Sequence, residues 1–79
     1  RKELDEKFTK HTEVMRSAVT ANELRGIAST LTREISAHIK SAQERRDEDY
    51  EKYLSGRLRR LNQIEKECLD KLKQKEEAI

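Results

Sequence analysis

The stretch LTREISAHIKSAQERRDEDYEKYLSGRLRRLNQIEKECLDKL, residues 31–72, is the clearest guide to the structure. Its mostly apolar series recurs at steps of three, four and four residues, a period of about 3.67 residues per turn, with Arg46 and Arg57 as polar members. This period is typical of an amphipathic α-helix, and the chain contains no proline to interrupt one. Continued to Ile79, the series predicts one long helix over residues 31–79 with an apolar stripe on one side.

The apolar stripe of this helix also extends backward to Leu24 and is widest between Tyr50 and Leu61, where additional leucines flank it. A wide apolar face is where we expect the centre of an interface with other helices. We therefore predict that the stripe docks against a partner helix. The predicted interface residues are Leu24, Leu31, Ile35, Ile39, Tyr50, Tyr53, Leu54, Leu58, Leu61, Ile64, Cys68 and Leu72.

Residues 1–20 follow a different pattern, that of a short heptad-patterned helix. The series Leu4, Phe8, His11, Met15 and Ala18 alternates steps of four and three residues. Its phase differs by about 200° from that of the stripe that begins after residue 20. One straight helix would present its two parts to opposite sides. Residues 21–30 are therefore expected to hold a phase break, a bend or a turn.

The sequence offers two ways to turn the chain and one way to continue it. Thr20 and Glu23 match the capping box that begins a helix. Alternatively, Gly26 ends a first helix and Ser29 or Thr30 caps the next. The third interpretation is a continuous helix, because a glycine inside a helix costs only ~1 kcal/mol. We slightly favour a continuous or merely bent rod over a helical hairpin.

The composition favours an all-α fold built as a coiled coil or helical bundle. Of the 79 residues, 43% are charged and 33% are hydrophobic, so the apolar supply is small for a compact core. A fully helical chain would be ~118 Å long at 1.5 Å per residue. Such a rod cannot bury its own stripe, and we expect a helical partner or a second copy of the chain, as a homo-oligomer, to cover it.

Few residues have the spacing of a chemical site. Glu34 and His38 are four residues apart, as helical metal ligands often are, but two ligands without a third are typical of a solvated pair. We expect no catalytic residues, no cofactor and no metal. Cys68 is the single cysteine and has no partner for an internal disulfide, which favours a reducing compartment. No apolar run approaches the ~20 residues of a membrane span.

These observations predict a non-catalytic coiled-coil or helical-bundle segment that serves protein–protein interaction or oligomerisation. We expect it to belong to a larger intracellular, cytoplasmic scaffold, cytoskeletal or trafficking protein. The alternative is a basic helix that binds nucleic acid or a lipid surface through Arg57, Arg59, Arg60 and nearby lysines. The net charge of only +2 argues against a large electrostatic footprint.

Overall fold

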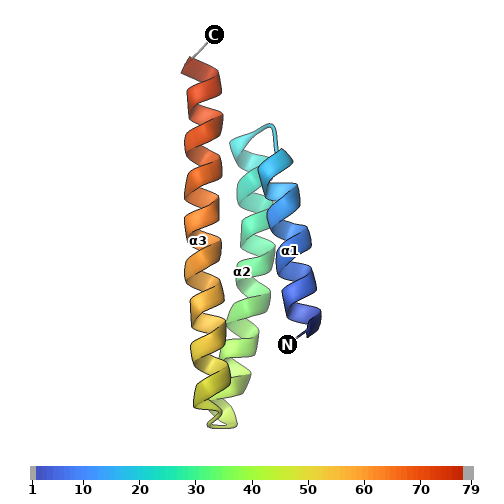
Figure 1. The fold of residues 1–79 in the computed structure, drawn as a ribbon, viewed down its shortest axis with the longest axis vertical. Helices are drawn as coiled ribbons and strands as arrows, with labels where there is room; N and C mark the ends of the chain where they lie inside the picture. The colour runs from blue at the N-terminus through green and yellow to red at the C-terminus, as the bar shows by residue number, and fades with distance from the viewer. Residues whose placement is uncertain (1, 78–79) are drawn as a thin grey trace.

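The computed structural model describes residues 2–77, which form three helices: α1 (Lys2–Ser17), α2 (Ala21–Glu44) and α3 (Glu48–Glu77). The helices run up, down and up in one elongated bundle, 51 Å long and 17 by 16 Å across (Figure 1). The pairing of α2 with α3 is the most extensive, and that of α1 with α3 is the least. The expected all-α fold is confirmed, as a helical bundle.

The chain buries its apolar stripe against itself. Leu24, Leu31, Ile35, Leu54 and Leu61 have no exposed surface at all, and Leu4, Phe8 and Met15 of α1 pack into the same core. The expectation of a ~118 Å rod that needs another chain to cover its stripe is therefore wrong for this structure. Two turns bring the apolar faces of three short helices together, so a narrow stripe suffices for an internal core.

The first turn lies at residues 18–20 and is built by the predicted capping box. The backbone N–H of Glu23 donates to Thr20 Oγ1 at 3.1 Å, and Glu23 Oε2 accepts from the backbone N–H of Val19 at 3.3 Å. Gly26 lies inside α2, and residues 21–30 are helical. The rod that we slightly favoured is wrong, because a hairpin lets two stripes about 200° out of phase face one core.

The second turn, at residues 45–47, divides the helix that was predicted to run from 31 to 79. The N–H of Arg46 donates to the Gln43 carbonyl at 3.1 Å and that of Asp47 to the Ala42 carbonyl at 2.9 Å, the bonds of a Schellman C-cap. Arg46 takes the left-handed position that glycine usually fills, with φ of 55°. This conformation costs roughly 1–2 kcal/mol for a residue with a Cβ atom.

The start of α3 offsets part of that cost. Asp47 Oδ1 accepts a hydrogen bond from the backbone N–H of Tyr50 at 3.2 Å, which satisfies one of the unpaired donors of the first turn. Three carboxylates follow in the first turn and complement the positive end of the helix dipole. They are Glu48, Asp49 and Glu51.

Replacing Thr20 by alanine tests the first turn. The Thr20→Ala variant loses the acceptor for the Glu23 N–H, and we expect its free energy of unfolding to fall by ~1 kcal/mol in urea denaturation. Thr30→Ala is the matched control, because its hydroxyl bonds only to the Gly26 carbonyl within α2. Equal stabilities of the two variants would contradict the capping role.

Candidate functional site

Two features of the surface combine apolar or aromatic side chains with charged ones. The first, called here the aromatic corner, joins α1 to α3 and consists of Asp5, Phe8, Tyr50, Tyr53 and Arg57. The second, the α1–α2 groove, is a shallow hollow of about 470 Å³ between the first two helices. The groove is lined by Lys10, His11, Val14, Asn22, Glu23, Gly26, Ile27 and Thr30.

The aromatic corner gathers Phe8 and both tyrosines of the chain, and two of the three rings lie against one guanidinium. Arg57 Cζ lies 5.0 Å from the centroid of the Phe8 ring and 5.5 Å from that of Tyr53. The rings of Tyr53 and Tyr50 stack, with centroids 6.0 Å apart and an interplanar angle of 11°. Cation–π contact of this kind suits arginine, whose planar group also forms directed hydrogen bonds. The corner therefore has the residue types of an interaction site, but its contacts are made within the chain.

Asp5 supplies the negative charge of this corner from the first turns of α1. Its Oδ1 atom lies 3.1 Å from Nη2 of Arg57 and accepts a hydrogen bond from the Tyr53 hydroxyl. Desolvation raises the pKa of Tyr53 above its usual 10.0, and the hydrogen bond to the Asp5 carboxylate raises the pKa further. These contacts fasten α1 to α3, the pair of helices with the thinnest packing.

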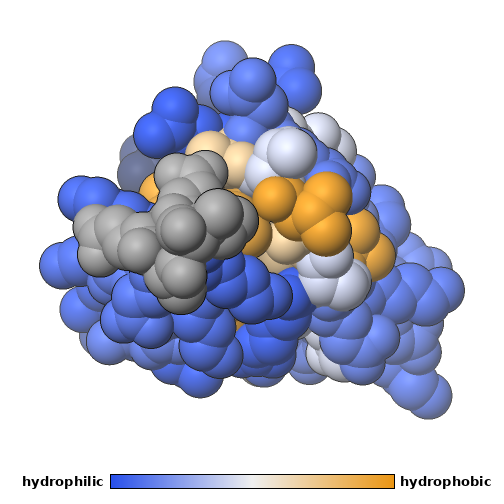
Figure 2. All heavy atoms as spheres, turned by 90° about the horizontal axis from the view of Figure 1, so that it is seen from above, coloured by the Kyte–Doolittle hydropathy of each residue, from blue (hydrophilic) through white to orange (hydrophobic). Residues whose placement is uncertain are grey.

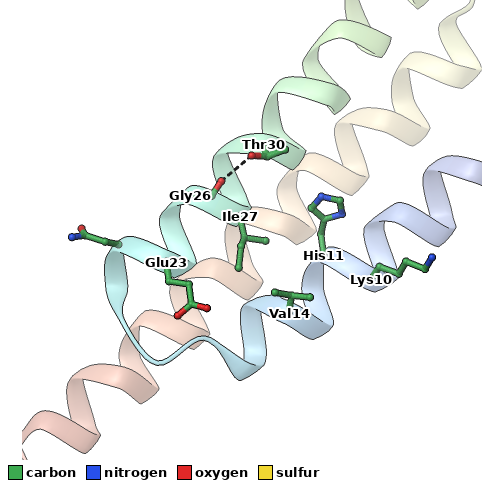
Figure 3. Close-up of a pocket in the computed structure, with 8 residues that line it drawn as sticks. Lys10, His11, Val14, Glu23, Gly26, Ile27 and Thr30 are labelled. Atoms are coloured by element: carbon green, nitrogen blue, oxygen red, sulfur yellow. Dashed lines mark hydrogen bonds between the residues drawn. The ribbon is translucent and has the colours of Figure 1, made fainter.

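The α1–α2 groove exposes two apolar side chains, of which Ile27 also packs against the edge of the buried core. Val14 is 50% exposed, and Ile27 is half-buried on the facing helix. Figure 3 shows Val14, Ile27 and the His11 ring between the two helices. The His11 ring is held by a hydrogen bond of 2.8 Å from Nδ1 to the Lys7 carbonyl. An apolar floor with a polar margin is the usual make-up of a binding groove.

A glycine of α2 lines the groove, and an ion pair joins the same two helices outside its lining. Lys7 Nζ pairs with Glu34 Oε2 at 3.5 Å, an ion pair that joins α1 to α2. On α2, Gly26 has nothing within 4 Å of the place where a Cβ would stand, and its φ is not positive. The Thr30 hydroxyl donates to the Gly26 carbonyl at 3.0 Å (Figure 3). The fold itself therefore does not require a glycine at position 26.

The end of the bundle where α3 finishes has a further apolar area. Figure 2, which views this end, shows hydrophobic side chains gathered in one part of a largely hydrophilic surface. Val19, in the turn between α1 and α2, is 78% exposed. This residue lies outside the α1–α2 groove and serves as a natural comparison for Val14.

The residues predicted as a partner interface face this chain's own helices. Seven of them are buried: Leu24, Leu31, Ile35, Leu54, Leu61, Ile64 and Cys68. The other five are half-buried against the same core: Ile39, Tyr50, Tyr53, Leu58 and Leu72. The stripe was placed correctly as a buried face, but in this structure it is covered by the chain itself. A separate partner could reach the seven buried side chains only if the bundle opened.

The three arginines of the alternative prediction do not form one basic surface. Arg57 turns toward Asp5 and the aromatic rings, whereas Arg59 and Arg60 are exposed. Because successive helical residues turn by about 100°, Arg59 lies about 160° around α3 from Arg57. Arg60 Nη1 donates to Gln63 Oε1 at 3.4 Å. The structure therefore engages Arg57 within the chain and places Arg59 on the opposite side of α3, whereas Arg60 lies only about 60° around the helix from Arg57.

The spacing of Glu34 and His38 does not produce a metal site in the structure. Glu34 faces Lys7 of α1, and His38 is exposed. Within residues 2–77, no three His, Cys, Asp or Glu side chains are grouped so that they could hold a metal ion. Cys68 carries a free thiol and is buried. No helix in this part of the chain combines the length and apolarity of a membrane span.

Sequence reasoning missed the α1–α2 groove because its apolar residues lie beside the periodic series. Val14 precedes Met15 of the heptad series, and Ile27 precedes Ala28 of the stripe. Their spacing to neighbouring groove residues, three from His11 to Val14 and three from Ile27 to Thr30, was the available signal. His11 itself, expected on the buried heptad face, is only half-buried, and Thr12 takes the buried position.

Comparison with known proteins gives no relative from which a function can be transferred. No protein-family model, no curated protein and no solved structure matches the chain.

The shifted pKa of Tyr53 predicts how the aromatic corner responds to alkali. Because the pKa of Tyr53 is higher in the folded than in the unfolded chain, the protonated hydroxyl stabilises the fold. This stabilisation is complete at pH values below the unfolded pKa of 10.0 and is lost as the pH rises through the folded pKa. From about pH 9 to about pH 11, the free energy of unfolding should therefore fall more for the wild type than for Tyr53→Phe. Tyr50→Phe, which leaves the Asp5 contact intact, is the control. Parallel profiles for the wild type and Tyr53→Phe would contradict this role.

Proposed function

We propose that the chain is a non-catalytic helical-bundle module for protein–protein interaction, and that its α1–α2 groove receives an amphipathic helix of a partner protein. The observation that carries this proposal is the half-exposed Val14 facing Ile27 between two antiparallel helices. A helix laid along such a groove buries its apolar ridge against both walls, as in a four-helix bundle. The parent protein, in this proposal, is an intracellular scaffold, cytoskeletal or trafficking protein.

Gly26 supports the same use of the groove. A glycine inside a helix costs roughly 0.5–1 kcal/mol relative to alanine, and no atom of the described structure comes within 4 Å of the place where a Cβ at position 26 would stand. Glycine does allow a second backbone to approach closely. Close approach of a partner helix that crosses α2 at Gly26 would explain the glycine, which the packing of the bundle itself does not require.

The margins of the groove indicate what its partner carries. Lys10 stands on the α1 side and Glu23 on the α2 side, so the two margins differ in charge. A partner helix with a carboxylate toward α1 and a cation toward α2 matches them. The groove has eight lining residues, fewer than the ~20–30 a side of a standard interface. We therefore propose a transient complex and not an obligate one.

A library of amphipathic helices displayed on phage, each about 18 residues long and about five turns, provides a probe of the groove. Selected peptides should shift the amide resonances of residues 10–14 and 23–30 of the folded chain. Val14→Asp should weaken their binding by at least about tenfold, because a carboxylate replaces the apolar floor. Val19→Asp, a change at a valine outside the groove, should leave binding unchanged.

Gly26→Ala provides a second test that separates binding from folding. Alanine meets no neighbour at this position, so the bundle should gain up to ~1 kcal/mol in stability while peptide affinity falls. Selected peptides that bind elsewhere, or that bind Val14→Asp as well as the wild type, would overturn the proposal.

A further inference from the structure

The turn between α2 and α3 contains no residue that usually breaks a helix, and one of its residues has a strained backbone conformation. Its residues are Arg45, Arg46 and Asp47, with neither glycine nor proline among them. Among the described residues other than glycine, Arg46 alone has a positive φ. An arginine is a good helix former, and the left-handed conformation is unfavourable for it. The backbone of this turn would therefore relax if residues 45–47 became helical.

The apolar stripe keeps its phase through this turn. From Ala42 the series of steps of three, four and four residues continues through Arg46 and Tyr50 and reaches Ile64, two eleven-residue periods after Ala42. Ala42 and Ile64, which are both buried, thus lie on one face of a hypothetical continuous helix. The first turn behaves differently, since the stripes on its two sides are about 200° out of phase. The apolar series therefore allows the two helices to join into one continuous helix at the second turn but not at the first.

A straightened α2–α3 helix is self-complementary. In the hairpin, α2 and α3 run antiparallel and supply the most extensive helix pairing of the bundle. Two straightened chains related by a two-fold axis near residue 46 restore that pairing, with α2 of each chain against α3 of the other. The same side chains are then buried against the same types of neighbour, which is the condition for domain swapping at low cost.

We propose that a second copy of this chain is a partner of the α2–α3 face, bound by exchange of α3 in an antiparallel dimer. Residues 45–47 become helical in this dimer, and each chain forms a continuous helix from Ala21 to Glu77, about 86 Å long at 1.5 Å per residue. α1 keeps its own α2 and receives the partner's α3. The proposal concerns a different face from the α1–α2 groove and does not depend on it.

Arg46 controls the balance between the two forms. In the hairpin it adopts the strained left-handed conformation, whereas in the dimer it lies on the stripe near the two-fold axis, facing its own copy. Repulsion between the two guanidiniums opposes the dimer, and release of the backbone strain favours it. Glu44, Asp47 and Glu48 lie close in sequence and reduce that repulsion. The two forms consequently exchange with protein concentration.

Substitutions at Arg46 separate these two effects. Arg46→Gly removes the strain of the turn and weakens the continuous helix, so it should shift the chain to the monomer. Arg46→Leu keeps the left-handed strain and places an apolar side chain at the axis, so it should shift the chain to the dimer. Sedimentation and X-ray scattering from about 10 µM to about 1 mM give mass and length together. Circular dichroism verifies that each variant is folded.

The expected result is a wild-type monomer–dimer equilibrium in which the dimer has a long dimension near 86 Å, against 51 Å for the hairpin. The dimer fraction should rise in Arg46→Leu and fall in Arg46→Gly. A wild-type chain that stays monomeric over this range overturns the proposal. A dimer with the length of two hairpins side by side, at about 51 Å, also overturns it.

Disulfide trapping identifies which chains supply the contacting helices. Gln43 Nε2 and Glu51 Oε1 lie 3.4 Å apart across the turn and are exposed. Cysteines at both positions, in a Cys68→Ser background, should form covalent dimers on oxidation at high concentration and internal bonds at low concentration. Internal bonds at every concentration would count against exchange even where the chain dimerises. Peptide binding to the α1–α2 groove is scored separately, so failure of one proposal is distinguishable from failure of the other.

Discussion

The bundle depends on the apolar residues lying on the core-facing side of each helix before and after each turn. A chain with 33% hydrophobic residues can close a core only if nearly every apolar side chain faces it. Residues 2–77 meet this condition through antiparallel return at 18–20 and again at 45–47. Leu24, Leu31 and Leu61 are consequently fully buried although no helix is apolar on more than one side. The elongated shape follows, because each helix contributes one narrow row to the core.

The sequence was sufficient to predict that the chain is helical and which apolar residues face the core, because a period near 3.6 residues indicates an amphipathic helix; it did not predict the bounds of α2 and α3. The capping box at Thr20 and Glu23 was also readable, since it rests on local hydrogen bonds. The choice between rod and hairpin could not be read from the sequence, because the two structures differ only in which helix covers the apolar stripe. Burial by the same chain and burial by a partner leave the same pattern of residues.

The turn at 45–47 escaped prediction for a physical reason. The apolar series runs through it without a change of phase, and the chain has no glycine or proline there. What marks the turn is charge: Arg45 and Arg46 follow the end of α2, and Asp47 with Glu48 and Asp49 begins α3. Cations at the carboxyl end of one helix and carboxylates at the amino end of the next complement both helix dipoles. The candidate groove was missed for a related reason, because Val14 and Ile27 are single apolar residues beside a stronger series.

Backbone chemical shifts of the chain, recorded at a concentration where sedimentation shows a monomer, test most directly whether the chain covers its own stripe. The structure predicts helical shifts interrupted at 18–20 and at 45–47, together with nuclear Overhauser effects between the Phe8 ring of α1 and the Arg57 side chain of α3. Uninterrupted helical shifts through residues 45–47 in a monomeric sample, without contacts between Phe8 and Arg57, would contradict it.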